Sequence, residues 1–136
     1  MTIDRAKLGK RNKTLGSNAE RLYAKLFREE LGFTFCKTSR QASRLHDDAG
    51  IDLFGVPGLN VQIKAGHQKG MNNSKVLSVI KERIVELFSP DNSVHSNINI
   101  LIHRKAVGTG KNRNEFDDLV TMSFNDFKKL KDIKWE

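Results

Sequence analysis

The chain contains few cysteine, proline, tyrosine or tryptophan residues, and each scarcity argues against a class of protein. Its 136 residues include a single cysteine, Cys36, so neither an internal disulfide nor a cysteine-based zinc site is available. Two prolines and the absence of biased tracts are typical of a folded globular domain. One tyrosine and one tryptophan provide no aromatic strand surface of the kind that RNA-binding platforms use.

Long apolar runs are also missing. No stretch approaches the roughly 20 apolar residues that cross a bilayer, so we expect no membrane partner. The N-terminal sequence MTIDRAKLGKRNK lacks the apolar region of a secretory signal. Together with the single cysteine, these absences favour a reducing, cytoplasmic setting, and the length of the chain favours one domain.

Positive charge is what the chain has in excess. It carries 24 Lys and Arg against 16 Asp and Glu, a formal net charge of +8. A surplus of this size on a small domain most often serves a polyanion, and nucleic acid is the commonest. The basic residues cluster at 5–13, 37–44 and 104–113, outside the best periodic segments. We therefore expect arms or loops that follow a phosphate backbone.

Hydrophobic periodicity predicts an α/β domain with one mixed central β-sheet flanked by helices, in the order α-β-β-β-α-β-β-α. We expect residues 1–15 to form a basic N-terminal arm and residues 16–136 a single domain. The expected helices are 17–31, 75–88 and 123–130, the last with Phe124, Phe127 and Leu130 inward. The expected strands are 33–36, 51–56, 61–65, 98–102 and 119–122, and the polar segment 37–50 is expected to be a loop.

Two of these strands suggest a functional site. Residues 51–56 and 61–65 flank a Pro57-Gly58 turn signal, which predicts a hairpin. With the turn centred near Gly58, Asp52 falls opposite Lys64, and Gln62 lies one pleat away. Aspartate is disfavoured in strands, so Asp52 in an otherwise apolar segment indicates a role other than strand formation.

Phosphodiester hydrolysis needs such residues. A hard cation neutralises the phosphate and activates water, and Asp and Glu oxygens are its preferred ligands. A lysine beside it orients the water or stabilises the developing charge. Asp52, Lys64 and the helix residue Glu20 supply these parts. Structural interpretations stay open: Ser17 and Glu20 match a capping box, Asp52 and Lys64 a cross-strand ion pair, and Gln62 an ordinary outward residue.

The segment Gly50-Ile51-Asp52-Leu53-Phe54-Gly55, followed by Val61-Gln62-Ile63-Lys64-Ala65, resembles the core of the PD-(D/E)XK nuclease superfamily. The opening helix of its archaeal-type Holliday-junction resolvases is similar to this chain at residues 16–21, 26–27 and 32–33. A second similarity to that group lies downstream, at residues 119–122 and in the following helix with Phe127. The resemblance spans roughly residues 16–130. It implies a restriction-endonuclease-like core and a metal-dependent endodeoxyribonuclease, acting as a homodimer on DNA, double-stranded or branched, such as Holliday junctions.

By that resemblance, Asp52 is the central metal ligand, Glu20 a second ligand and Lys64 the catalytic lysine. The backbone carbonyl of Ile63 completes the shell around Mg²⁺, for which Mn²⁺ substitutes. The family places an acid two residues before the lysine, where this chain has Gln62. A carboxamide offers a neutral oxygen, so we expect weaker metal binding, and the number of metals stays open.

The basic segments supply the expected DNA contacts. Relatives in the resembled group carry a basic, Ser-containing loop against DNA where this chain has residues 39–44, and His67 and Lys69 follow the lysine strand, with a plain surface loop as the alternative for His67. The predicted DNA-binding residues are Lys10, Arg11, Lys13, Ser39, Arg40, Ser43, Arg44, His67 and Lys69. Asp47 and Asp48 are interpreted as loop residues that cap or solvate, and Cys36 as a strand residue rather than a nucleophile.

Two other hypotheses compete with the nuclease. In the first, Gln62 marks a weak or inactive site, and the basic surface of a nuclease-fold module only holds DNA. In the second, the protein binds RNA, which the scarcity of non-Phe aromatic residues disfavours. A compact intracellular nuclease, associated with the nucleoid, fits recombination, repair or the processing of phage DNA.

Overall fold

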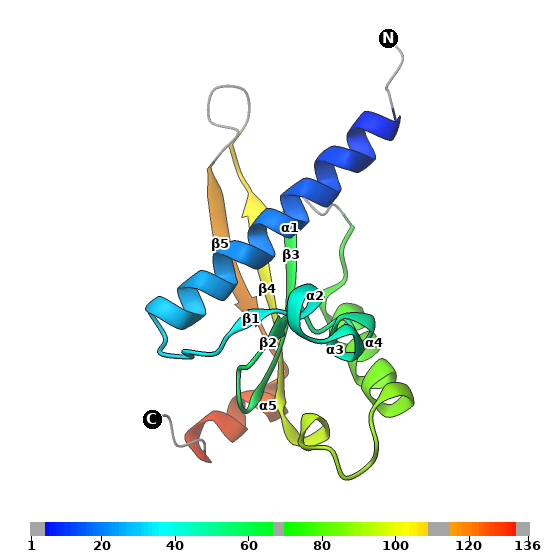
Figure 1. Ribbon diagram of the computed structural model, residues 1–136, viewed down its shortest axis with the longest axis vertical. Helices are drawn as coiled ribbons and strands as arrows, with labels where there is room; N and C mark the ends of the chain where they lie inside the picture. The colour runs from blue at the N-terminus through cyan, green and yellow to red at the C-terminus, as the bar shows by residue number, and fades with distance from the viewer. Residues whose placement is uncertain (1–4, 67–69, 109–114, 133–136) are drawn as a thin grey trace.

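The computed structural model describes residues 5–66, 70–108 and 115–132, which form a mixed α/β structure (Figure 1). The elements are α1 (Arg5–Glu29), β1 (Lys37–Thr38), α2 (Ser39–Ala42), α3 (Arg44–Asp48), β2 (Leu53–Phe54), β3 (Leu59–Gly66), α4 (Asn73–Leu87), β4 (Ile98–Ala106), β5 (Phe116–Thr121) and α5 (Phe124–Lys129), with 3-10 turns at Ser93–Ser96 and Leu130–Asp132. No helix in these ranges is long and apolar enough to span a membrane.

A three-stranded mixed sheet in the order β3-β4-β5 forms the centre of the fold. β3 and β4 are parallel, with Gln62 opposite Leu101 and Lys64 opposite His103, whereas β5 runs antiparallel to β4. Parallel strands need a crossover connection, and α4 provides it. A mixed sheet flanked by helices is therefore confirmed, although β1 and β2 form a separate two-stranded sheet rather than joining it.

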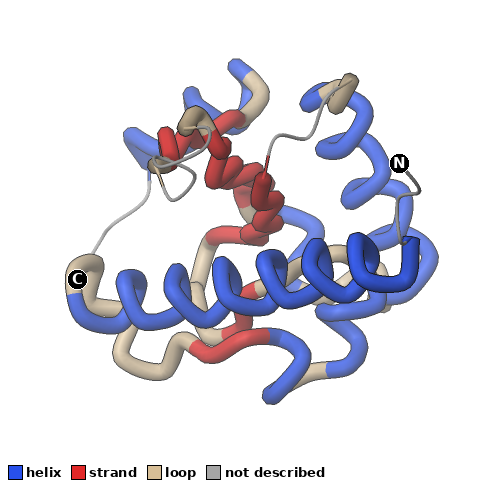
Figure 2. Tube along the Cα trace, turned by 90° about the horizontal axis from the view of Figure 1, so that it is seen from above, coloured by secondary structure: helices blue, strands red, loops and turns tan. Residues whose placement is uncertain are grey.

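Each face of the sheet is covered by one helix. Residues spaced four apart on α1, Ala19, Tyr23 and Phe27, pack with Val61 and Ile63 of β3 in one apolar cluster. A second cluster joins α4 to the opposite face; its buried residues are Ala49, Ile51, Leu77, Ile80, Ile84, Phe88, Val94 and Leu101. Viewed from above, the long α1 helix runs along one side of the strands (Figure 2). Residues of β3 therefore face α1 and α4 alternately, and Gln62 and Lys64 share the α4 side.

The first helix begins earlier than predicted. α1 starts at Arg5 rather than Ser17, so most of the segment expected to be an arm is helical. The segment contains no proline, and good helix formers such as Ala, Leu, Lys and Arg outnumber its glycines. Ser17 and Glu20 lie inside the helix, and the capping-box interpretation is therefore wrong.

The predicted hairpin is also wrong in its pairing. β2 pairs with β1, not with β3, through Thr38 opposite Leu53. One backbone hydrogen bond still joins the two expected strands: the Asp52 N–H donates to the Val61 carbonyl over 2.7 Å. Asp52 therefore lies beside Val61 and Ile63 rather than directly opposite Lys64.

A close approach of the chain at Gly55 explains the pairing. Gly55 has φ +83°, and a Cβ there would lie 2.5 Å from the Phe35 carbonyl oxygen. Only glycine lets residues 33–36 come this near, and the following residues then form β1 against β2. The expected strand at 33–36 is absent from this described stretch, and the expected loop at 37–50 contains β1, α2 and α3.

The C-terminal half follows the predictions more closely. α4, β4 and β5 confirm the expected helix and strands within a few residues. Arg104 and Lys105 lie within β4 rather than in a loop, and Arg104 pairs with Asp118 at 3.1 Å. Lys111 and Arg113 lie outside the described residues. Phe124 and Phe127 are 73% and 56% exposed, so their predicted inward orientation is wrong.

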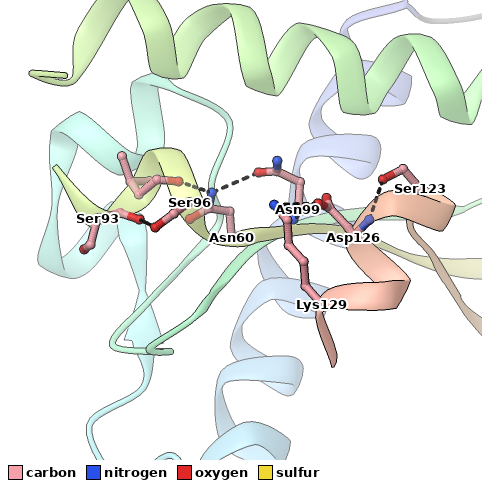
Figure 3. Close-up of polar contacts among 8 residues, drawn as sticks. Asn60, Ser93, Ser96, Asn99, Ser123, Asp126 and Lys129 are labelled. Atoms are coloured by element: carbon pink, nitrogen blue, oxygen red, sulfur yellow. Dashed lines mark hydrogen bonds and ion pairs between the residues drawn. The ribbon is translucent and has the colours of Figure 1, made fainter. Parts of the chain in front are cut away.

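A polar network fastens α5 and the turn before β4 to the sheet (Figure 3). Buried Asn60 donates to Asn99 Oδ1 at 2.9 Å and to the Val94 carbonyl at 3.0 Å. Buried Asp126, on α5, accepts the Asn99 backbone N–H at 3.1 Å and pairs with Lys129 at 3.2 Å. Satisfied buried polar groups fix one arrangement of neighbouring elements, here at the N-terminal ends of β3 and β4.

Candidate active site

Asp52 is held by the main chain of β3. Its Oδ2 atom accepts the Ile63 backbone N–H at 2.7 Å, and its own carbonyl accepts the Ser39 N–H at 2.8 Å. The Asp52 N–H is bound to Val61, as described above. These bonds tie the residue to α2 and β3, so its carboxylate has one fixed position at the edge of the sheet.

Glu20 approaches the same region from α1. Its side chain is buried, with the residue 6% exposed, and it pairs with Arg40 of α2 at 3.2 Å. Arg40 also donates to Ser17 Oγ at 3.2 Å, so two positions of α1 contact one guanidinium. Ser17 and Glu20 thus do have a shared role, which is to dock α2 rather than to cap a helix.

The pKa of Asp52 responds to its burial and to charged residues around it. Burial raises the pKa of Asp52 to about 7; the Ile63 N–H opposes this rise, the Glu20 carboxylate adds to it and the Lys64 ammonium opposes it. Burial also raises the pKa of Glu20, against the lowering effect of Arg40. The charges of Glu20 and Lys64 therefore both act on the Asp52 carboxyl.

Asp47 is a residue whose contribution the sequence analysis missed. It lies on α3, is half-buried, and its charge raises the pKa of both Glu20 and Asp52. Its place in the polar segment 37–50 favours a loop residue that caps or solvates. Its position just upstream of the Asp52 segment, with only Asp48 between it and Ala49, is the available signal.

Gln62 supplies an unused acceptor on the α4 side of β3. Its Oε1 atom is buried and has no hydrogen-bond partner among the described residues. A buried polar atom without a hydrogen-bond partner costs folding free energy, and a bound ligand can supply the missing partner. Gly50 lies against its amide: a Cβ at Gly50 would be 3.5 Å from Gln62 Nε2.

The oxygen atoms of this region are of the kind that a hard divalent cation takes. In the described part of the chain, no three His, Cys, Asp or Glu side chains are grouped to hold a metal ion. The available set is the carboxylates of Asp52 and Glu20 with the neutral Gln62 oxygen, all oxygen ligands of the type that Mg²⁺ and Mn²⁺ take. The raised pKa of Asp52 comes first from burial of its carboxyl, and the charges of Glu20 and Asp47 add to it.

The predicted DNA-binding residues differ in accessibility. Ser39 is fully buried, so its hydroxyl cannot reach a phosphate, and that prediction is wrong. Ser43 caps α3 by accepting the His46 N–H at 3.3 Å. Arg44 is open to solvent, with a side chain 94% exposed, and Lys13 is exposed on α1. Arg40 is half exposed but paired with Glu20. His67 and Lys69, and the side chains of Lys10 and Arg11, lie outside what the structure describes.

Cys36 is buried, and burial raises the pKa of its thiol to about 11. A thiol with so high a pKa is a poor nucleophile, in keeping with the structural role expected for it. It directly precedes β1 and is not part of a strand, so its predicted place in a strand at 33–36 is wrong.

No family model, curated protein or solved structure matches the chain. The functional argument therefore depends on the residues and their geometry.

Proposed function

We propose that this protein is a divalent-metal-dependent endodeoxyribonuclease with a restriction-endonuclease-like core. The observation that carries the proposal is the half-buried Asp52 carboxyl, fixed by the Ile63 N–H at 2.7 Å, with a pKa of about 7 and with the charges of Glu20 and Lys64 acting on it. Strongly perturbed carboxyls beside a lysine are characteristic of catalytic sites. The net charge of +8 supports a nucleic-acid substrate.

In this proposal Asp52, Glu20, Gln62 Oε1 and the Ile63 carbonyl hold Mg²⁺ or Mn²⁺. When bound, the cation supplies charge neutralisation at the phosphate and acidifies a water molecule. Lys64 orients the attacking water and stabilises negative charge on the phosphoryl oxygens. The Ile63 N–H keeps the Asp52 carboxylate in place, and Arg40 holds Glu20.

The proposed substrate is DNA, double-stranded or branched, bound along exposed cations such as Lys13 and Arg44. Symmetric cutting of a four-way junction needs two active sites, so the proposal includes a homodimer. The setting is the cytoplasm, at the nucleoid, in recombination, repair or processing of phage DNA.

A cleavage assay tests the proposal. Protein is incubated with a labelled four-way junction and a matched linear duplex in EDTA, Mg²⁺ and Mn²⁺. We expect cleavage in either metal, none in EDTA, and a loss of at least about a hundredfold in Lys64→Ala, because positioned acid–base groups contribute factors of 10²–10⁴. Lys25→Ala, which removes an exposed charge from α1, is the matched control and retains activity.

The second candidate is a binding module with the same fold. Gln62, in place of an acid, and the lack of a three-acid cluster in the described residues favour it. It predicts salt-sensitive DNA binding with no cleavage in any metal. Cleavage in Mg²⁺ or Mn²⁺ separates the two functions. Gln62→Glu tests the place of Gln62: it tightens Mg²⁺ binding if Gln62 faces the metal, whereas equal affinity in both forms removes Gln62 from the site.

A further inference from the structure

A cavity opens between β3 and α4, next to the proposed active site. Its volume is about 400 Å³, within the range of small-ligand sites. Its lining residues are Ala49, Gly50, Gln62, Lys64, Gly70, Met71, Asn72, Lys75, Val76, Val79, Ile80 and Arg83. Gln62 and Lys64 belong to both the cavity and the site, so the cavity begins where the proposed chemistry takes place.

The walls of this cavity combine two kinds of surface. Met71, Val76, Val79 and Ile80 provide apolar side chains from α4 and the segment before it. Lys64, Lys75 and Arg83 provide positive charge, and none of the described lining residues is acidic. A ligand that matches both surfaces has a flat apolar body and an anionic end.

A nucleotide is such a ligand. Every nucleobase has an apolar face that packs against side chains, and its phosphates are anionic. Because Lys64 faces the phosphate undergoing cleavage in the proposed mechanism, the neighbouring base is the group within reach of the cavity. A base stacked and paired inside a duplex cannot enter a pocket between a strand and a helix, so the nucleotide must be unpaired or extruded.

We propose that the cavity between β3 and α4 binds one unpaired nucleotide of the DNA substrate, with the base against Val76, Val79 and Ile80 and its flanking phosphates on Lys75 and Arg83. This inference rests on the proposed function and specifies its substrate class. DNA with an unpaired nucleotide at the cleavage point, as in bulges and at branch points, is preferred to uninterrupted duplex.

The test measures affinity without metal, by fluorescence anisotropy in EDTA, so that it does not depend on catalysis. Three labelled DNAs are compared: a duplex, the same duplex with one unpaired nucleotide, and that bulged duplex with the unpaired base removed to leave an abasic site. We expect the bulged DNA to bind about tenfold more tightly than the duplex, and the abasic form to return to duplex affinity.

Val79→Trp fills the cavity and should abolish the preference while keeping duplex affinity. Val85→Trp is the matched control, because Val85 lies on the same helix, is 72% exposed and does not line the cavity. The abasic comparison uses the unaltered protein, so the test stands even if Val79→Trp does not fold.

Equal affinity for the three DNAs overturns the inference, as does a preference that survives removal of the base. Cleavage of DNA in Mg²⁺ alongside either result would leave the proposed nuclease intact. Absence of binding to any of the DNAs would overturn both.

Discussion

Asp52 is a carboxyl whose ionised form the fold disfavours, chiefly because the group is removed from solvent. Its carboxyl is desolvated and near the carboxylates of Glu20 and Asp47, while one N–H and the Lys64 ammonium oppose the effect. The balance raises its pKa to about 7. A residue that serves folding alone would be expected to avoid this arrangement, whereas active sites commonly retain it.

The pH dependence of stability follows from this shift. Because the pKa of Asp52 is higher in the folded state than in the unfolded chain, the unfolded chain loses this proton at a lower pH. The contribution of Asp52 to folding is therefore complete below about pH 4 and is lost as the pH rises to about 7. Asp52→Asn keeps an acceptor for the Ile63 N–H but carries no charge, so it should be more stable than the unaltered protein at pH 8 by about 1–3 kcal/mol.

Urea denaturation at pH 5 and pH 8 measures this difference. The stability advantage of Asp52→Asn should be smaller at pH 5, and Mg²⁺ should stabilise the unaltered protein but not the variant, because only the former gains free energy from binding. A variant less stable at pH 8 than the unaltered protein would contradict the assignment of Asp52 as a strained, desolvated carboxyl.

At the level of elements, the sequence predicted best those whose stability comes from their own periodicity. The spacing of apolar residues in α4 and the continuous apolar run of β4 predicted the bounds of both elements to within a few residues. The predicted hairpin was wrong because a strand can pair with distant segments as well as with its neighbour. Here β2 pairs with β1, and Gly55 permits the close approach of Phe35 on which this pairing depends. Asp52 and Lys64 were nevertheless predicted as neighbours, since both lie near Ile63 in either topology.

The last helix shows a different limit. Its i, i+3 pair Phe124 and Phe127 predicted an inward apolar face, yet the two rings stack on each other near the surface. The buried residue of α5 is Asp126, which bonds the Asn99 N–H. An amphipathic pattern does not reveal that a helix docks through a charged residue, since the partner is a backbone group of a distant strand.

Removing this bond should loosen α5. Asp126→Ala leaves the buried Asn99 N–H without its acceptor, which should cost about 1–3 kcal/mol of unfolding free energy. Lys129→Ala removes only the half-exposed ion pair with Asp126 and should cost about 0–1 kcal/mol. Urea denaturation of the two variants compares the backbone hydrogen bond with the ion pair. Equal losses of unfolding free energy would show that the hydrogen bond to the Asn99 N–H contributes nothing beyond the ion pair.

Over the whole molecule, the excess positive charge is divided between structural and free groups. Arg40 and Arg104 are engaged with Glu20 and Asp118, and their charges are partly neutralised within the fold. Arg44 is 94% exposed in its side chain, and its contact with Asp48, at 3.8 Å, is long. Exposed ion pairs of this kind contribute little, so Arg44 remains available to an external phosphate.

The salt dependence of DNA affinity separates a specific contact from net charge. Each phosphate neutralised adds about 0.9 to the slope of log affinity against log salt on duplex DNA. Arg44→Ala should lower that slope by about 1, because one phosphate contact is lost. Lys131→Ala removes the same charge from an exposed position near the C-terminal turn and should leave the slope unchanged, although the net charge falls from +8 to +7 in both variants. Equal slopes in the two variants would mean that DNA responds to the overall charge alone, and that the surface around α3 is not where the duplex lies.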